Sequence, residues 1–224
     1  QLALLLADNE AMAPSAEADP SIQRLLRIAA AEGHRGAAWH LARRLHLGLG
    51  TAAEPEEAII WYRRAADAGS AQAAAVLAQH LHLGIFCKRD AAGAVAYALQ
   101  AAEAGEPRAG LLLGQWFRQG TNGLPRDDRE AIDWLTFAAM EGNVPAMYEL
   151  ACALLDCAEG RGKENDDATG NCEEAEAIKW LDDAIVACQR GEGAAGHIYE
   201  AALRRLAACY YEGTGVAQSE ETAI

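Results

Sequence analysis

The apolar positions of the chain fall into two alternating stripes, and the first stripe marks one kind of helix. A small residue is followed by Leu four positions later, by another small residue at five, and by a large apolar side chain at eight. This spacing places the apolar side chains on one face of a helix. The leading small residues are Ala37, Ala73, Ala109 and Ala146. We term each such helix a helix A, and we expect Gly48, Gly84 and Gly120 to end the first three, because glycine readily takes the left-handed conformation.

The second stripe predicts another helix, helix B, in which an aromatic residue follows an alanine by three positions. The pairs are Ala58 with Trp61, Ala94 with Tyr97, Ala131 with Trp134, and Ala177 with Trp180. Helix starts are indicated by Pro55 in a first turn, by Asp90 as a cap, and by Asp127 with Glu130 in a capping box. Small residues let the helices approach closely, so we expect the aromatic side chains to fill the space between neighbouring repeats.

Helix A and helix B together form a repeat that ends on a shared Ala-Ala-x-x-Gly segment. Its glycines are Gly33, Gly69, Gly105 and Gly142, which gives a period of about 36 residues. The predicted fold is an all-α solenoid of antiparallel helix pairs, as one domain over 1–224. Its approximate repeats are 1–33, 34–69, 70–105, 106–142, 143–191 and a partial 192–224. Leu2 to Asn9 would be an earlier helix A, and Ala223 would begin a further helix B. We therefore expect either a piece of a longer protein or disorder in the last residues.

These motifs resemble those of the Sel-one-like repeat, a relative of the tetratricopeptide repeat. The nearest stretches are AIIWYRRAADAG at 58–69 and YYEGTGV at 210–216, while the Gly-x-Gly-Val turn is degraded at Gly84 and Gly120. The resemblance implies a right-handed superhelix whose concave side is lined by helix A and contacts other proteins. It also implies a bacterial signalling, envelope or host-interaction role, with the periplasm or cell envelope favoured over the cytoplasm, and no conserved active site.

Charge and hydropathy exclude several classes of partner. The formal net charge is -14, from 19 Lys and Arg against 33 Asp and Glu. An evenly spread negative charge repels phosphate backbones, so nucleic acid is not an expected partner. The longest apolar run, Leu2 to Ala7, is far shorter than the roughly 20 residues that cross a bilayer. We therefore expect no membrane insertion.

Two segments depart from the period. The first is an acidic, glycine-containing insertion over 156–176, which we interpret as a solvated loop. Calcium binding is the alternative, but the carboxylates do not follow the alternating spacing of a calcium loop. The second segment, 186–200, contains three glycines and would lengthen the turn before the last helix A, where it would bend the superhelix or contact a partner.

The cysteines and histidines do not predict a metal site. Six cysteines occur without any C-x-x-C pair, which argues against a zinc cluster. Cys157 and Cys172 flank the insertion, and we hypothesise that they form a disulfide if the compartment is oxidising. The other cysteines are interpreted as small buried hydrophobic residues. Four histidines, 40, 46, 80 and 82, lie on the first two A helices, but helices about 10 Å apart are distant for shared coordination.

Helix A leaves a second face for a protein ligand, at the second, sixth and ninth positions after its leading small residue. These positions hold Trp39, Arg43, His46, Gln79, His82, Leu111, Gln115, Arg118 and Tyr148. Aromatic and arginine side chains dominate interface energetics; the alternative is that some of the set pack against neighbouring repeats. Because this set carries arginine and histidine in an acidic chain, net charge does not identify the partner.

The sequence contains no nucleophile elbow, phosphate loop or His-Glu-x-x-His motif, so neither an enzyme nor a cofactor is expected. The predicted function is a protein-protein interaction scaffold or regulator that binds its ligand on the concave helix A face. The alternative is an immunity protein that neutralises a secreted bacterial toxin, a role that some proteins of this repeat family have.

Overall fold

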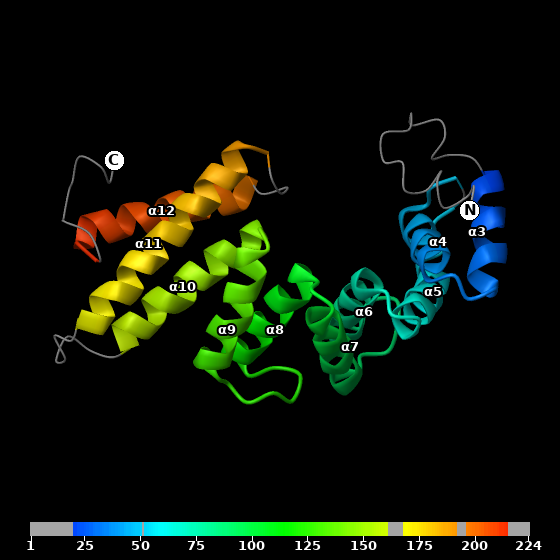
Figure 1. Ribbon diagram of the computed structural model, residues 1–224, viewed down its shortest axis with the longest axis horizontal. Helices are drawn as coiled ribbons and strands as arrows, with labels where there is room; N and C mark the ends of the chain where they lie inside the picture. Colours follow the sequence, from blue (N-terminus) through cyan, green and yellow to red (C-terminus); the bar gives the residue numbers. More distant parts are fainter. Residues whose placement is uncertain (1–19, 51, 161–167, 192–195, 215–224) are drawn as a thin grey trace. The chain divides into compact units, whose positions relative to one another are not determined.

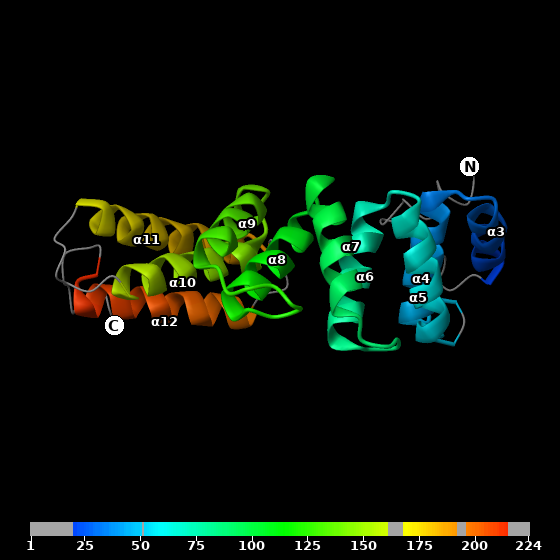
Figure 2. The ribbon, with the colours of Figure 1, turned by 90° about the horizontal axis from the view of Figure 1, so that it is seen from below.

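The computed structural model describes residues 20–50, 52–160, 168–191 and 196–214, and within these ranges it contains ten helices and no strand (Figures 1 and 2). In order they are α3 (Pro20–Ala31), α4 (Arg35–Leu47), α5 (Pro55–Asp67), α6 (Ala71–Leu83), α7 (Ala91–Glu103), α8 (Pro107–Gln119), α9 (Asp128–Met140), α10 (Val144–Gly160), α11 (Ala168–Gln189) and α12 (Gly196–Glu212). The A helices are α4, α6, α8, α10 and α12. The predicted helices at Leu2 to Asn9 and from Ala223 lie outside the described residues.

The chain divides into two compact units, Gln1–Ala109 and Gly110–Ile224, which we call unit 1 and unit 2. In unit 1 each helix from α3 to α7 packs against the next, and in unit 2 the same holds from α9 to α12. Consecutive helices are therefore neighbours, as the pattern of helix pairs predicted. That the repeats of 1–224 act as one domain stays a prediction.

The predicted helix ends are confirmed where the described chain contains them. Gly48 and Gly84 follow α4 and α6 with φ of 70° and 68°, and their N–H groups donate to the carbonyls of Arg44 and His80. Gly120 ends α8 with φ of 64°. A side chain at these φ values is strained, so the glycines turn the chain sharply from each helix A towards its helix B.

The predicted helix starts are also confirmed. Pro55 is the first residue of α5. The Asp90 carboxylate accepts a hydrogen bond from the backbone N–H of Gly93, and Asp127 accepts from those of Arg129 and Glu130. These bonds satisfy N–H groups that have no partner inside the helix.

Among the stripe aromatics, Tyr97 contacts a neighbouring B helix, and Trp61 is the one that is buried. Trp61 is 8% exposed and donates through Nε1 to Glu57 at 3.0 Å. The Tyr97 hydroxyl of α7 donates to Asp67 of α5 at 2.8 Å. Tyr97, Trp134 and Trp180 are half-buried, and Trp180 packs against the core of unit 2. The contact predicted between repeats is therefore made by Tyr97, while Trp61 and Trp180 take part in core packing.

An ion pair also connects α3 to α5 in unit 1. Both terminal nitrogens of Arg27 donate to the Glu57 carboxylate, one of them at 2.9 Å. The Arg27 hydrogen bonds are the main reason why the pKa of Glu57 falls to about 2. Charge-assisted, two-point pairs of this kind are stronger than neutral hydrogen bonds, so the first described helix is tied to the next helix B.

Alanine and leucine fill the cores of both units, and glycine replaces alanine where helices approach most closely. Leu41, Leu77 and Leu135 are 0% exposed. A Cβ on Gly114 of α8 would lie 2.5 Å from the Leu135 Cγ of α9, a distance at which the atoms overlap. The packing of α8 on α9 thus depends on the missing side chain.

The expanded repeat is more helical than the sequence predicted. Helix α10 continues to Gly160 and α11 begins at Ala168, so the predicted loop over 156–176 is helical at both of its ends. Alanine and glutamate, which occur at both ends, are good helix formers, and α10 and α11 lie side by side (Figures 1 and 2). The second irregular segment is also shorter, since α11 reaches Gln189 and α12 begins at Gly196.

The prediction of buried cysteines holds for Cys209, which is 4% exposed, while Cys87, Cys152 and Cys188 are half-buried. The side chain of Cys172 lies outside the described residues. A disulfide between Cys157 and Cys172 therefore stays a prediction.

Candidate protein-binding faces

The nine side chains predicted to form a contact surface are all half-buried, and they divide between the two units. With their neighbours they define two surfaces. The A face of unit 1 consists of Trp39, Arg43, His46, Gln79, His80, His82, Phe86 and Arg108. The A face of unit 2 consists of Leu111, Gln115, Arg118, Tyr148, Glu149, Asp156, Glu159 and Arg205.

The A face of unit 1 is built around Tyr62, a helix B residue that is only 3% exposed. The Trp39 ring lies 5.5 Å from the Tyr62 ring, measured between centroids. His46 lies 6.1 Å from Tyr62 and 5.1 Å from His80. At such separations rings attract one another beyond the effect of burial alone. Helix B therefore supplies a buried platform, and the two A helices place their rings upon it.

Phe86 covers the histidine end of this cluster from the turn after α6. Its ring centroid lies 6.0 Å from those of both His46 and His80. The side chain is still 47% exposed, and its φ is 61°, a conformation that is uncommon for any residue other than glycine. The turn thus holds a large apolar ring at the surface beside the two histidines.

The histidines of this face are closer together than the sequence suggested. Side chains from adjacent helices reach towards each other, so the rings of His46 and His80 meet at 5.1 Å although the helix axes are further apart. Burial, followed by repulsion from His46, lowers the pKa of His80. Within the described part of the chain, the Nδ1 atoms of both rings are buried without a hydrogen-bond partner. His80 therefore favours its neutral imidazole, and the two rings act as packing groups.

Two arginines lie at the borders of the same cluster. Burial raises the pKa of Tyr62 to about 12, and the charges of Arg43 and Arg108 act in the opposite direction. Arg108 is exposed and donates to Oε1 of Gln79 at 2.8 Å. The A face of unit 1 thus combines aromatic rings with positive charge.

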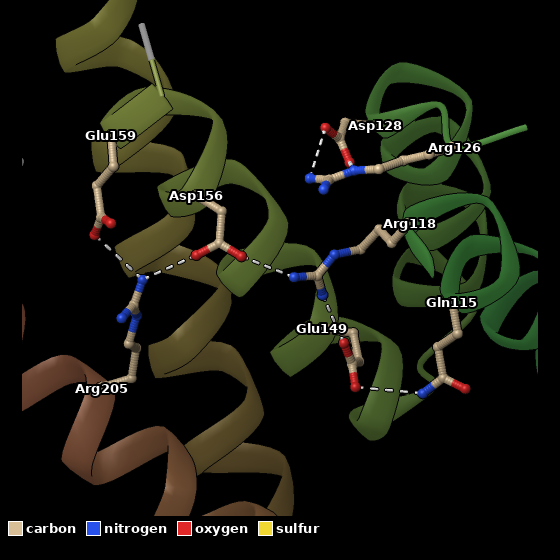
Figure 3. A network of polar contacts seen from close by, with 8 residues as sticks. All are labelled: Gln115, Arg118, Arg126, Asp128, Glu149, Asp156, Glu159 and Arg205. Atoms are coloured by element: carbon tan, nitrogen blue, oxygen red, sulfur yellow. Dashed lines mark hydrogen bonds and ion pairs between the residues drawn. The ribbon is translucent and has the colours of Figure 1, made fainter. Parts of the chain in front are cut away.

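The A face of unit 2 is an ion-pair ladder across successive A helices (Figure 3). Arg118 of α8 donates to Glu149 and to Asp156 of α10, each at 2.8 Å. Arg205 of α12 approaches the other oxygen of Asp156 at 3.3 Å and Glu159 at 3.4 Å. The Gln115 amide donates to Glu149 at 3.3 Å. The carboxylates of α10 therefore lie between cations from both neighbouring helices.

The geometry of α10 explains the ladder. Glu149 and Asp156 are seven residues apart, and Asp156 and Glu159 three apart, so all three carboxylates project from one side of the helix. The Arg118 side chain is 24% exposed and that of Glu149 29%, which limits screening of this pair by water and salt. Arg126 and Asp128, also drawn in Figure 3, form a separate and more exposed pair.

Two residues predicted for the contact surface serve the core of unit 2. Leu111 and Tyr148 both pack against its main apolar cluster. Burial, and then the hydrogen bond with Cys152, raises the pKa of Tyr148 to about 12. These two side chains follow the alternative that the sequence left open, namely packing against neighbouring repeats.

Sequence reasoning missed Tyr62, Phe86, Glu149, Asp156 and Arg205. Tyr62 directly follows the stripe residue Trp61, so the apolar pattern assigned its whole helix to the core. The carboxylates could have been found, because among the described A helices α10 alone carries acidic residues at both the third and the tenth position after its leading small residue. Phe86 gave no signal, because nothing in the sequence indicates a left-handed turn there.

Within the residues that the structure describes, no three His, Cys, Asp or Glu side chains are grouped so that they could hold a metal ion. The described helices also include none with the length and apolar character needed to span a membrane.

Comparison with known proteins shows that a family model of helical repeats matches the chain. The family model of the Sel1 repeat matches residues 36–70, 71–106, 107–143 and 200–224, which together make up more than half of the chain. No curated protein matches the chain in sequence.

Solved structures share the fold. A Sel1 repeat protein from Oxalobacter formigenes has a TM-score of 0.72 at 21% identity, over 99% of this chain and 81% of its own. The protective antigen c5321 of uropathogenic Escherichia coli, which displays an SLR fold, has a TM-score of 0.76 at 22% identity over 92% of this chain. This chain spans 40% of that protein. The immunity protein Pa5087 from Pseudomonas aeruginosa has a TM-score of 0.51 at 17% identity, over 99% of this chain and 74% of its own. At these identities the likeness shows the fold alone, and it confirms the predicted solenoid of helix pairs.

Proposed function

Because the chain belongs to the Sel1 repeat family, a family of typically non-catalytic helical scaffolds, we propose that it binds another protein through the A faces of its repeats. In this role it acts as a scaffold or regulator. It catalyses no reaction and needs no cofactor, and its ligand is a protein and not a nucleic acid.

One observation carries the proposal, namely the exposed aromatic edge of unit 1. Phe86 is 47% exposed although its ring lies against two histidines, and Trp39 is half-buried against Tyr62. Aromatic side chains anchored in this way lose little conformational entropy on binding and supply much of the energy of protein interfaces. Leu47, Leu83 and Ile85 add exposed apolar surface at the same ends of α4 and α6.

The test is a capture experiment with variants. The purified chain is used as bait in extracts of the source cell, next to Trp39→Ala and Phe86→Gly, the second of which fits the left-handed backbone of the turn. We expect a captured protein that forms a defined complex on gel filtration and is lost from both variants. Exposed Tyr211→Ala, on α12, is the control and keeps the partner. A partner that both face variants retain would contradict the proposal.

A second candidate is the immunity protein expected as the alternative. The likeness to the immunity protein Pa5087 over 99% of this chain favours it within the binding class. An inhibitor would form one tight complex with a toxic enzyme encoded nearby and abolish its activity on mixing. Unchanged toxin activity at saturating concentrations of the chain would leave the scaffold as the role.

The proposed compartment is the periplasm or cell envelope of a bacterium. The redox state of Cys157 and Cys172 tests this proposal. Disulfides persist in such oxidising compartments. We expect the two cysteine peptides to migrate as one linked mass without reductant and as two with it. Equal masses under both conditions would favour the cytoplasm.

A further inference from the structure

His80 makes several of the contacts that hold the turn between α6 and α7. The backbone N–H groups of Gly84 and Ile85 donate to the His80 carbonyl at 2.8 and 3.3 Å, and Sγ of Cys87 donates to the same oxygen at 3.6 Å. The ring of Phe86 lies 6.0 Å from the imidazole, measured between centroids. The backbone and the side chain of His80 therefore both hold the segment that carries the exposed aromatic edge of unit 1.

The corresponding turns of two other repeats are held by residues that do not titrate near neutral pH. His80 stands seven positions after the leading small residue of α6, and Arg44 and Trp116 stand at the same position of α4 and α8. Their carbonyls accept from the N–H groups of Leu49 at 2.9 Å and Thr121 at 3.1 Å, so the three turns are built alike. A histidine changes its charge between about pH 5 and 8, whereas arginine stays charged and tryptophan neutral.

The packed surroundings of the His80 ring disfavour its protonation. An imidazolium carries an N–H on both ring nitrogens, but Nδ1 of His80 is buried without a hydrogen-bond partner in the described part of the chain. Burial is the largest cause that lowers the pKa of His80, and repulsion from His46 follows. A backbone hydrogen bond with Ile85 acts in the opposite direction, and the charge of Arg108 lowers the pKa further. The packed arrangement therefore favours the neutral ring.

The other side chains around this ring are aromatic, polar or cationic. On α5, Tyr62 stacks on the imidazole at 6.4 Å between centroids, and the charge of Arg43 from α4 acts on Tyr62. Arg63 of α5 acts on the thiol of Cys87 in the turn. A proton on His80 would thus add positive charge beside groups that are neutral or positive.

Acidic side chains of the adjoining segments are bonded elsewhere or exposed. Asp90, at the end of the turn, accepts from a backbone N–H of α7, and Asp67 of α5 accepts from the Tyr97 hydroxyl at 2.8 Å. Glu103, the last residue of α7, is exposed. Among the described residues, no carboxylate affects the pKa of His80, so no partner stabilises its charged form in place.

The turn is the part of this cluster that moves most readily. Gly84, Ile85 and Phe86 are exposed, and the φ of Phe86 is 61°. A left-handed φ is unfavourable for a large side chain and persists only where surrounding contacts hold it. Leu81, by contrast, is 1% exposed, which keeps α6 in the core. A charged His80 ring therefore reaches water at least cost when the turn moves away.

We propose that His80 is an acid-sensitive latch, which as a neutral ring holds the turn of Phe86 against the A face of unit 1 and on protonation releases it. Because the closed turn lowers the pKa of His80, this turn is favoured above the ordinary histidine pKa. It is lost as the pH falls through that value towards the lowered one. Release would remove Phe86 from the surface proposed to bind a partner protein, so binding would weaken in mild acid. This consequence rests on the proposed function.

The test is amide hydrogen exchange of the full chain, followed residue by residue by NMR. It is recorded at about pH 7.5 and about pH 5.5, on either side of the ordinary histidine pKa of about 6.5, and corrected for the intrinsic rate at each pH. At the lower pH we expect faster corrected exchange at Gly84 and Ile85, by at most about tenfold per pH unit, the limit for one proton. The matched turns, read at Leu49 and Thr121, should keep their rates. Unchanged rates at Gly84 and Ile85, or equal acceleration in all three turns, would overturn the inference.

A variant assigns the effect to His80. His80→Phe keeps a ring beside Phe86 and does not titrate, so the ratio of its corrected rates at the two pH values should fall to about one at Gly84 and Ile85, since no proton is taken up there. His34→Gln, at an exposed histidine, should keep the ratio of the parent chain. A ratio in His80→Phe equal to that of the parent would overturn the inference. Circular dichroism at both pH values checks that each variant is folded.

The effect on binding is measured with the protein captured by the chain in the experiment proposed above. Its affinity for the parent chain should fall between the higher and the lower pH, and its affinity for His80→Phe should fall less. Equal falls for both chains would overturn regulation through His80. Failure to capture any protein, together with an acid-opened turn, would contradict the proposed function and leave the latch intact.

Discussion

The two units place different chemistry on the same repeat positions. At the ninth position of helix A, unit 1 has His46 and His82, whereas unit 2 has Arg118. His46 packs among aromatic rings, and Arg118 joins a ladder of carboxylates. The same helix frame therefore supports one face whose charges are paired within the chain and another face built from aromatic rings, and we propose that the second of these binds the ligand.

The largest loss of stability is expected where helix B supports the A face of unit 1. Tyr62→Ala removes a ring that is 3% exposed and on which Trp39 and His46 pack. Truncation of a buried aromatic residue typically costs about 3–5 kcal/mol. We expect a loss of this size in the free energy of unfolding, measured in urea by circular dichroism. Tyr211→Ala, at a side chain 62% exposed, is the control, and equal losses in both variants would contradict the platform.

A smaller loss of stability is expected in unit 2, where α8 and α9 approach each other closely. Gly114→Val places a side chain 2.5 Å from Leu135, and overpacking of this kind costs about 1–3 kcal/mol. The change also moves α8, which carries Arg118, so the ladder should weaken. Gly196→Ala has open space around its Cβ and should unfold at the same urea concentration as the parent chain. An unchanged Gly114→Val variant would show that the contact is not tight.

The ladder itself should contribute less than the packing beneath it. A double-mutant cycle of Arg118→Gln and Glu149→Gln measures the pair directly. We expect a coupling of about 1 kcal/mol, since the pair is only partly exposed, and we expect it to shrink in high salt. The cycle for Arg126 and Asp128, whose side chains are 70% and 43% exposed, should give almost none. Similar coupling in both cycles would show that the Arg118–Glu149 pair contributes no more to stability than an exposed surface pair.

The smallest effect is expected in the pH dependence of unit 1. The pKa of His80 is lowered in the folded chain by burial and by His46, so the folded state favours its neutral form. Stability from this group is present above the unfolded pKa and is lost as pH falls through it towards the folded value. His80→Gln should therefore flatten the decline in melting temperature on acidification. His34→Gln, at an exposed residue, is the control and should leave the slope of melting temperature against pH unchanged. An unchanged slope in His80→Gln as well would contradict this role of His80.

Periodic packing made most of the fold predictable from sequence. Ala37, Leu41 and Trp61 repeat because every repeat must bury the same surface against its neighbours, and the caps at Asp90 and Gly84 follow from local backbone needs. The site was less predictable, because neighbours on a helix face come from different repeats. No local pattern shows that Arg118 meets Asp156, or that Phe86 closes over His46. The extension of α10 to Gly160 was missed because glycines and charges around it are typical of loops.

The most direct test of the central claim is hydrogen exchange on the complex of the chain with its captured partner. The account predicts slower amide exchange in α4, in α6 and in the turn at Phe86, with exchange in α12 unchanged. Protection confined to the B helices, or to α10 and α12 with α4 and α6 unaffected, would contradict binding through the A face of unit 1.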